Sequence, residues 1–307
     1  MRHIVLGASG GSGRAVVREL SARGVRVGAV SRSGRGEPLP DVEYVRGDAA
    51  DGENLKAICR DAVVIYHCVN VPYPQWSTHL LPIAHAVVAA AGTTAARLVV
   101  MDNLYMYGPP TSPMTETTPR AARGRKGRLR AQLEDYFLNA HRTGVVRLAI
   151  GRASDFYGVA ATSVSNMLVI TPAIQGKPAS WLGTLDVLHT FSYLPDVARG
   201  LITLGERDEA LGEVWHLPAA DSLTGRQFIE MVFAELDRPP RMRVISRPMM
   251  LFAGLFSPLI RESLEVFYQF ERPFVMDSSK FSRTFGMRPT PHRDAIRETL
   301  RLAHKET

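Results

Sequence analysis

Short apolar runs alternate with longer segments of helical periodicity along the first half of the chain. The apolar runs suit strands buried on both faces of a parallel sheet, and they cover residues 3–6, 25–30, 42–45, 63–68, 98–101 and 145–150. The segments between them include residues 15–22 and 79–91, and the second is followed by Gly92, a typical residue at a helix C-terminus. This alternation predicts an α/β fold with a doubly wound parallel Rossmann sheet.

The regular alternation stops after Gly151, where prolines at 172, 178, 195 and 218 and tryptophans at 181 and 215 appear. Residues 189–194 and 214–217 are predicted strands, and Pro195 suits the first turn of a helix between them. We therefore expect a Rossmann domain of residues 1–155 and 189–217, interleaved with a smaller substrate-binding portion of residues 156–188 and 218–307. Residues 248–274, rich in Met, Leu and Phe, are expected to form a lid or, for most of them, core.

A glycine-rich turn joins the first predicted strand to the first predicted helix. Its spacing, Gly7-x-x-Gly10-x-x-Gly13, permits a tight turn, close approach of the backbone to a pyrophosphate and close packing of the helix on the strand. The anion would lie at the helix N-terminus. An ordinary turn is the alternative, but the position after the first strand favours a dinucleotide site. The residues expected to bind it are Gly7, Ser9, Gly10, Gly11, Ser12 and Gly13.

The second predicted strand ends in Ser31-Arg32-Ser33, where an NAD-binding protein would have an acidic residue for the ribose hydroxyls. Arg32 and the two hydroxyl groups suit the 2′-phosphate of NADP(H), so this cofactor is preferred over NAD(H). A surface arginine in a loop is the alternative. Three further residues are expected at the cofactor: Asp48 at the adenine amine, and Val69 and Asn70 in the loop after the fourth strand.

Composition narrows the class of protein. The net charge of +7 over 307 residues suits an anionic ligand, and a phosphorylated cofactor satisfies it as well as a nucleic acid. The six basic residues within 120–130 have no interleaved aromatic residues, so we expect no nucleic-acid partner. The two cysteines, at 59 and 68, lack metal-ligand spacing, so we expect no metal. A strand at residue 3 leaves no room for a signal peptide and the apolar stretch 249–260 is too short to span a bilayer, so we expect a cytoplasmic protein without a membrane partner.

Taken together, several motifs resemble the extended short-chain dehydrogenase/reductase family, in its branch of NAD-dependent epimerases and dehydratases. The resemblance covers nearly the whole chain. It implies a nicotinamide cofactor and, as a family expectation, a homodimer formed through helices at 76–91 and 120–143. The motifs are the glycine turn, Gly47-Asp48, Tyr107-Gly108, Arg152 with Phe156-Tyr157-Gly158, and the segment 194–199.

The sequence departs from this family at the catalytic positions. In the family, a Ser or Thr lies four residues before the tyrosine of the Tyr-Gly pair, but here that position holds Asn103. The family's Tyr and Lys positions on the next helix hold Lys126 and Arg130. The usual Ser-Tyr-Lys set is therefore absent, and the family's proton-transfer mechanism cannot simply be carried over.

Lys126 is the first candidate for the missing acid. The spacing of Lys126, Arg130 and Glu134 is similar to the isoflavone-reductase-like branch of the superfamily, where a lysine at this position takes the acid/base role. Burial and cationic neighbours such as Arg123 and Arg125 would favour its neutral form. The alternative is a solvated lysine on a basic helix. In either case, Arg130 would hold the ribose or tune the lysine.

Tyr105 is the second candidate acid, because the loop after the fifth strand faces the substrate. Asn103 would donate its amide to a substrate carbonyl, although a turn-forming role is the commoner one for Asn. The substrate is expected to contact mostly aromatic residues, which favours an apolar or ring-shaped ligand over a nucleotide sugar. These residues are Tyr73, Trp76, Phe156, Tyr157, Trp181 and His189.

The leading hypothesis is an NADP(H)-dependent oxidoreductase that reduces a carbonyl or conjugated double bond of a small, largely apolar metabolite, with Lys126 as proton donor. A redox-neutral epimerase, isomerase or cyclase with the same cofactor site is the second hypothesis. A non-catalytic protein that senses NADP is the third. An open cleft beside the nicotinamide would favour an enzyme, and a collapsed one the sensor.

Overall fold

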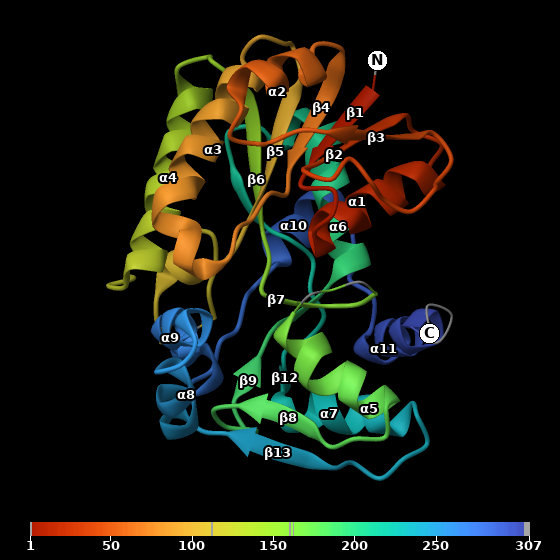
Figure 1. The fold of residues 1–307 in the computed structure, drawn as a ribbon, viewed down its shortest axis with the longest axis vertical. Helices are drawn as coiled ribbons and strands as arrows, with labels where there is room; N and C mark the ends of the chain where they lie inside the picture. Colours follow the sequence, from red (N-terminus) through yellow and green to blue (C-terminus); the bar gives the residue numbers. More distant parts are fainter. Residues whose placement is uncertain (1, 112, 160, 162, 304–307) are drawn as a thin grey trace.

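A computed structural model of the chain describes residues 2–111, 113–159, 161 and 163–303. Its centre is a seven-stranded sheet in which all paired strands run parallel (Figure 1). The strand order reverses between β1 and β4, which is where open α/β sheets bind ligands. In spatial order the strands are β3 (Val42–Arg46), β2 (Val27–Ser31), β1 (Arg2–Leu6), β4 (Ala62–His67), β5 (Arg97–Asp102), β6 (Arg147–Arg152) and β11 (Val214–His216).

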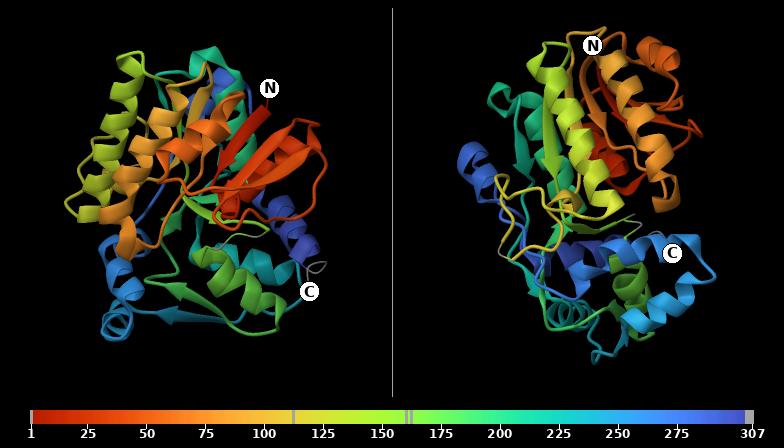
Figure 2. Two further views of the ribbon diagram at one scale, coloured as in Figure 1. Left: turned by 45° about the horizontal axis from the view of Figure 1, so that its top comes forward. Right: turned by 90° about the vertical axis from the view of Figure 1, so that its left-hand side faces the viewer.

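Helices cover both faces of this sheet. Alternate residues of β1 point to opposite faces, so Ile4 and Val5 belong to different core clusters. The helices α1 (Gly11–Ala22) and α6 (Leu194–Glu206) pack together over the Val5 face. The other face carries α2 (Gly52–Cys59), α3 (Trp76–Ala91) and α4 (Arg125–Arg142), and the right panel of Figure 2 looks onto α3 and α4.

A smaller portion of the chain lies at the carboxyl end of the sheet (Figures 1 and 2). Its three strand pairs are β7 (Asp155–Tyr157) with β10 (Phe191–Tyr193), β9 (Leu188–His189) with β12 (Leu223–Thr224), and β8 (Ala179–Leu182) with β13 (Met242–Ile245). Buried aromatic residues such as Trp181 and Phe228 fill its core. Its helices are α5 (Thr171–Ile174), α7 (Gly225–Ala234), α8 (Arg247–Gly254), α9 (Pro258–Ser263) and α11 (His292–Ala303), with a π-helix at Asn166–Ile170 and a 3₁₀ helix at Leu264–Phe270.

The predicted α/β fold with its doubly wound parallel sheet is confirmed, and two expectations for the second half need correction. Residues 189–194 do not form one strand of the sheet, because β9 and β10 pair elsewhere and Leu194 begins α6. The helix α10 (Ser279–Phe285) packs on β11 of the main sheet through Trp215 and Phe281. Residues 248–274 were expected to form a lid or mostly core, and they divide: Val266, Phe267, Phe270 and Phe274 are buried, whereas most of the large apolar residues of 249–259 are exposed.

The helices that the structure describes include none long and apolar enough to cross a lipid bilayer. The division of the chain into a cofactor-binding and a substrate-binding part stays an interpretation.

Candidate active site

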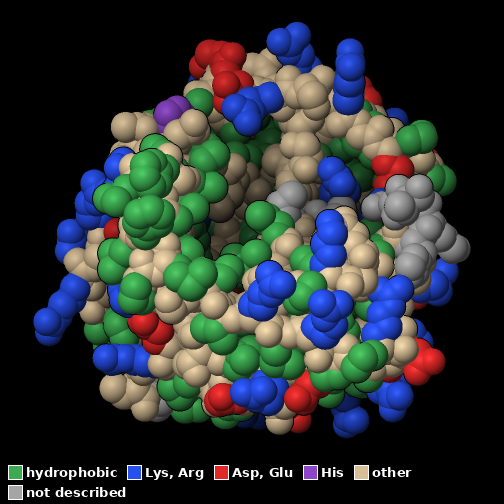
Figure 3. All heavy atoms as spheres, turned by 60° about the horizontal axis from the view of Figure 1, so that its bottom comes forward, with side chains coloured by type: hydrophobic (Ala, Val, Ile, Leu, Met, Phe, Trp, Pro, Cys, Tyr) green, Lys and Arg blue, Asp and Glu red, His purple; other side chains and the backbone are tan. Residues whose placement is uncertain are grey.

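A cavity of about 930 Å³ opens along the carboxyl ends of β1, β2, β4 and β5. At one end it is lined by the glycine turn, Arg32 and Asp48, and at the other by Tyr73, Tyr105 and Asp155. Figure 3 shows it as a deep hollow in the face turned to the viewer. Ligand sites usually measure about 300–1,000 Å³, so this cavity has room for a dinucleotide and a small second ligand.

The glycine turn can bring its backbone close to a pyrophosphate, because its glycines have no side chains. Side chains at Gly7 and Gly13 would collide with neighbouring backbone atoms. Gly7 has a φ of +82°, and a Cβ atom there would lie 2.8 Å from the carbonyl oxygen of Cys68. A Cβ atom on Gly13 would lie 2.2 Å from the carbonyl oxygen of Gly7. The first turn of α1 has no side-chain cap at Gly10, so its amide groups are available to an anion.

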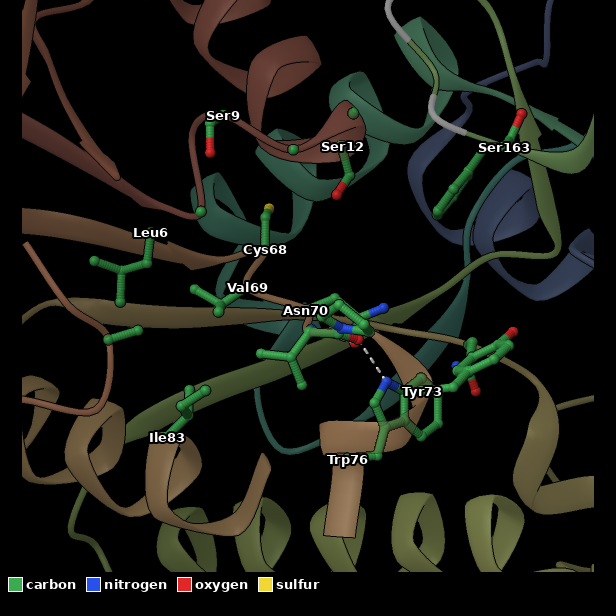
Figure 4. Close-up of a pocket in the computed structure, with 18 of the residues that line it drawn as sticks. Leu6, Ser9, Ser12, Cys68, Val69, Asn70, Tyr73, Trp76, Ile83 and Ser163 are labelled. Atoms are coloured by element: carbon green, nitrogen blue, oxygen red, sulfur yellow. Dashed lines mark hydrogen bonds between the residues drawn. The ribbon is translucent and has the colours of Figure 1, made fainter. Parts of the chain in front are cut away.

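Polar groups around this turn point into the cavity. Figure 4 shows Ser9 and Ser12 extending from the turn toward the space beside Cys68, Val69 and Asn70 at the end of β4. All five residues line the cavity, as Gly7, Gly10 and Gly11 do. Gly13 lies behind the lining, where it allows α1 to approach the turn. The predicted cofactor residues of this region are thus brought together.

The end of β2 lies at the far side of the same cavity. Ser31 and Arg32 line it, and the Ser31 hydroxyl lies 3.2 Å from that of Ser33. Arg32 is exposed and makes no ion pair with any residue that the structure describes, so its guanidinium is available to a phosphate. Asp48 also lines the cavity, and its Oδ1 accepts a hydrogen bond of 3.0 Å from the amide of Ala50. Ser33 does not reach the lining.

Lys126 is buried, but it does not line the cavity. Its Nζ lies 2.5 Å from a carboxylate oxygen of Glu262 and 3.6 Å from one of Glu265, and its backbone amide donates to Glu265 over 2.6 Å. The expectation of a cationic environment that favours a neutral amine is therefore wrong, because carboxylates surround this ammonium group. Hydrogen bonding to Lys126 lowers the pKa of Glu262, as expected for the partner in such an ion pair.

Arg130 lies in a buried network behind the cavity. Its guanidinium donates to Asp102 over 3.3 Å and to the side chain of Asn70 over 3.2 Å, and it stacks on the ring of Trp76 at 4.2 Å. Arg152 donates to the second oxygen of Asp102 over 3.2 Å and also pairs with Glu134. Arg130 thus orients Asn70, a predicted cofactor residue, from behind and does not itself line the cavity.

Tyr105 and Tyr73 form a hydroxyl pair at the end of the cavity away from Arg32. Their oxygen atoms lie 2.6 Å apart and both side chains line the cavity. Burial, followed by the charge of Tyr73, raises the pKa of Tyr105 well above its ordinary value of 10, and burial raises the pKa of Tyr73 to about 12. Both phenols are therefore protonated at neutral pH, which suits a proton donor.

Asn103 lines the cavity, but its side chain has a local task. The Oδ1 atom accepts a hydrogen bond of 3.1 Å from the amide of Tyr105, as is typical of Asn in turns. Asn103 thereby fixes the start of the 3₁₀ helix Tyr105–Tyr107. Tyr107 points away from the cavity, where its hydroxyl contacts Arg152 and His216.

Asp155, with His189 behind it, is the cavity residue that the sequence analysis missed. Nε2 of His189 lies 3.1 Å from Oδ2 of Asp155, and Nδ1 lies 3.2 Å from the carbonyl oxygen of Gln269. A carbonyl oxygen only accepts, so Nδ1 donates to Gln269 and Nε2 faces the carboxyl group of Asp155. Asp155 follows β6 closely in sequence, which is the signal that could have drawn attention to it.

The six predicted substrate residues divide into two groups. Tyr73, Trp76 and Phe156 line the cavity. Tyr157, Trp181 and His189 do not, so the expectation that they contact a ligand there needs correction. Tyr157 and Trp181 are buried in the core of the smaller portion, because their neighbours are Phe228, Phe191 and Phe270. His189 stacks between Phe270 and Phe274 and reaches the cavity only through Asp155.

Charge is unevenly distributed along the cavity. Arg32 is the only Lys or Arg among the described lining residues, and it lies at the end of β2. The opposite end has the carboxyl group of Asp155 beside Tyr73, Tyr105 and Gln269. That end therefore has no cationic side chain that could pair with a diphosphate. The described residues also include no cluster of His, Cys, Asp or Glu that could hold a metal ion.

Comparison with known proteins identifies the class. The model of the NAD dependent epimerase/dehydratase family matches residues 3–217, so the chain belongs to this family. The family and its similar structures comprise NAD-dependent dehydratases and epimerases. No curated protein matches the sequence.

Solved structures share the fold at low sequence identity. The dTDP-glucose 4,6-dehydratase from Bacillus anthracis in complex with NAD has a TM-score of 0.80 at 16% identity, covering 99% of this chain and 97% of that one. The corresponding dehydratase DesIV from Streptomyces venezuelae, with NAD bound, has a TM-score of 0.79 at 19% identity, with coverage of 99% and 97%. UDP-glucose 4-epimerase from Thermus thermophilus in complex with NAD has a TM-score of 0.78 at 17% identity, with coverage of 98% for both chains.

Proposed function

We propose that this protein is an NADP(H)-dependent oxidoreductase that reduces a carbonyl group or conjugated double bond of a small, largely apolar metabolite. One observation carries the proposal. A single cavity joins a dinucleotide cradle to an aromatic end that contains a protonated tyrosine pair and, among the described lining residues, no Lys or Arg. A cavity of this size beside the cradle also favours an enzyme over a sensor of NADP, which needs no second ligand site.

The preference for NADP(H) rests on the end of β2. Arg32 would pair with the 2′-phosphate and the Ser31 hydroxyl would donate to it, while no acidic residue at this position repels it. The similar structures named above bind NAD, so the preference is a departure proposed for this chain alone. The glycine turn and the N-terminus of α1 would hold the pyrophosphate.

Tyr105 is the proton donor that the geometry supports best. When bound, NADPH supplies a hydride to the carbonyl carbon or to the β-carbon of an enone. The oxygen that gains negative charge takes a proton from the Tyr105 hydroxyl. Tyr73, whose hydroxyl is 2.6 Å away and whose side chain is half-buried, returns a proton to Tyr105 from solvent. The raised pKa of Tyr105 keeps this phenol protonated at neutral pH until a more basic alkoxide forms beside it.

Lys126 remains the alternative donor suggested by the sequence. It would have to leave Glu262 and Glu265 and turn into the cavity before it could reach a substrate. Breaking a buried ion pair typically costs about 3–5 kcal/mol. We therefore assign Lys126 a structural role, in which it joins the start of α4 to α9 and the helix that follows.

Asp155 would select against anionic substrates. Its carboxyl group lies at the substrate end, and a nucleotide diphosphate there would meet this group without any compensating Lys or Arg among the described lining residues. A neutral ligand with an aromatic or alicyclic ring suits Tyr73, Trp76 and Phe156 better. Oδ1 of Asp155, the oxygen that does not face His189, would accept a hydrogen bond from such a ligand.

A redox-neutral reaction is the second candidate, and it is favoured by the epimerases and dehydratases among the similar structures. In that case the hydride removed from the substrate returns to it, and the cofactor undergoes no net change. The two candidates predict different absorbance changes, because only net reduction consumes NADPH.

The test uses the purified protein with NADPH and three classes of probe: an apolar cyclic enone, an apolar aromatic ketone and UDP-glucose. We expect the nicotinamide absorbance to fall with the enone or the ketone and to stay constant with UDP-glucose. Isomerisation or dehydration of UDP-glucose, detected by mass spectrometry and NMR with constant absorbance, would overturn the proposal in favour of the redox-neutral alternative. NADH serves as the control for cofactor preference.

A further inference from the structure

An exposed apolar surface lies beside the mouth of the cavity. Ten large apolar residues are exposed in the described part of the chain, and six of them lie within residues 249–259. Such clustering is unusual on a soluble protein and marks an interaction site. We call this surface the α8–α9 tip, and its members are Met249, Leu251, Phe252, Leu255, Phe256 and Leu259.

These side chains are strongly exposed. Phe252 is 68% exposed, Leu255 71% and Phe256 78%, and the two phenylalanine rings pack edge to face at 5.5 Å. The turn between α8 and α9 carries Leu255 and Phe256 at its outermost point, whereas Met250 on α8 packs against the core of the smaller portion. The tip therefore presents its apolar side chains outward on a firmly anchored base.

Four ion pairs hold this base in place. Glu262, in α9, pairs with Lys126 and Arg125 at the start of α4. Glu271 pairs with Arg247 at the start of α8 over 2.5 Å. Since Glu265 also pairs with Lys126, every carboxylate of residues 241–273 is engaged in an ion pair.

Positive charge at the tip is not neutralised in this way. Arg243, on β13 immediately before α8, and Arg261, on α9, are exposed, and neither makes an ion pair with a residue that the structure describes. An apolar surface flanked by free arginines and without free carboxylates complements a lipid bilayer that carries anionic headgroups. A second copy of this chain would bring its own arginines against these, which disfavours a symmetric dimer through the tip.

The tip is also continuous with the cavity. Leu259 is both a member of the tip and a lining residue, and α9 packs against the short helix Tyr73–Gln75 at the substrate end. Figure 3 shows apolar side chains gathered next to the hollow, on the side where α8 and α9 lie in Figure 1. A ligand dissolved in a bilayer could thus reach Tyr73 and Tyr105 along an apolar path.

We propose that the α8–α9 tip docks the protein on an anionic lipid surface, from which its apolar substrate enters the cavity. The docking is peripheral, and it revises the expectation of no membrane partner. The idea that the substrate comes from the bilayer rests on the proposed function, whereas the docking itself does not.

Sedimentation with vesicles tests the docking without cofactor or substrate, so its result is independent of the proposed reaction. The wild-type protein should bind vesicles of phosphatidylcholine and phosphatidylglycerol at least tenfold more tightly than vesicles of phosphatidylcholine alone, and added salt should weaken this preference. The double variant Phe252→Ser/Phe256→Ser should bind roughly 100-fold less tightly, because each ring contributes about a tenfold factor. Arg261→Glu should remove most of the preference for anionic lipid.

The matched control is Val145→Ser, which removes an apolar side chain that is 50% exposed after α4. It should bind vesicles like the wild type. Unchanged stabilisation by NADPH would establish that each variant is folded. Equal vesicle binding by the double variant and the wild type would overturn the proposal. The proposal would also be overturned if the wild type were a dimer that does not bind vesicles and the double variant a monomer. In that case a second copy of the chain would cover the tip.

Discussion

The two ends of the cavity differ in how far they follow the family. At the cofactor end, Gly7 and Gly13 adopt positions that exclude any side chain, and α1 offers uncapped amide groups. At the substrate end, Lys126 and Arg130, which the sequence analysis predicted at the family's tyrosine and lysine positions, are both engaged in ion pairs outside the lining. The predicted cofactor residues thus line the cavity, whereas these two predicted catalytic residues do not.

This difference has a physical origin. A pyrophosphate is the same in every dinucleotide, so the turn that binds it allows little variation in backbone shape. A substrate site needs an opening for the ligand, a proton donor and a suitable electrostatic environment, and several sets of residues can supply these. Here a tyrosine pair and a carboxyl group supported by a histidine occupy that end.

The largest expected effect concerns buried imidazoles, one near each end. His67 ends β4 beneath the cofactor end, and His216 is hydrogen-bonded to Tyr107 behind the substrate end. Burial, aided by nearby arginines, lowers the pKa of each from 6.5 to about 4. The unfolded chain therefore takes up protons first as the pH falls, and the free energy of unfolding should drop between about pH 6.5 and pH 4, by about 3 kcal/mol for each histidine.

Chemical denaturation at pH 7 and pH 4.5 measures this loss. His67→Gln and His216→Gln should each reduce the difference between the two pH values, because one titrating group is removed. His79→Gln, at an exposed position, should leave the difference unchanged. A pH dependence that is the same in all four proteins would contradict the assignment.

The second prediction tests the cofactor end by steric exclusion. Gly13→Ala would place a Cβ atom 2.2 Å from the carbonyl oxygen of Gly7, so the turn must shift. We expect the affinity for NADPH to fall by roughly 10- to 100-fold, the equivalent of about 1–3 kcal/mol for overpacking. Gly52→Ala is the matched control, since its nearest neighbours would lie 3.8 Å away. Titration calorimetry gives both affinities. An unchanged affinity of Gly13→Ala for NADPH would refute the assignment of the glycine turn as the pyrophosphate site.

The third and smallest effect concerns the choice of cofactor. Arg32→Ser should weaken NADPH binding by about tenfold and leave NADH binding nearly unchanged, because only the 2′-phosphate loses a charge-assisted hydrogen bond. Arg35, exposed three residues later, offers a control through Arg35→Ser, which should retain the preference. Equal losses for both nucleotides in Arg32→Ser would remove the argument for NADP(H).

The sequence was informative where function depends on local backbone geometry. The parallel sheet and the glycine turn followed from periodicity and spacing, and Arg32 could be predicted at the cavity because it directly follows β2. Each of these features is contained within a short segment. Each feature can therefore be interpreted without knowing which distant residues it contacts.

The substrate end could not be predicted in the same way, because its contacts join distant segments. Lys126 meets Glu262 across 136 positions, and Asp155 meets His189 across 34. An aromatic residue after a strand can line a cavity, as Phe156 does, or fill a core, as Trp181 does. The prediction that the apolar residues of 249–259 are core failed for a related reason. Composition alone does not distinguish a buried apolar segment from an exposed one.

Comparison of Tyr105→Phe with Lys126→Met tests the central claim most directly. Both side chains are buried, but only Tyr105 lines the cavity. With an apolar enone or ketone that the wild type reduces, Tyr105→Phe should lower the rate of NADPH oxidation by about 10²- to 10⁴-fold at unchanged NADPH affinity, whereas Lys126→Met should retain most of the activity. Full activity in Tyr105→Phe together with loss of activity in a folded, NADPH-binding Lys126→Met would contradict the account.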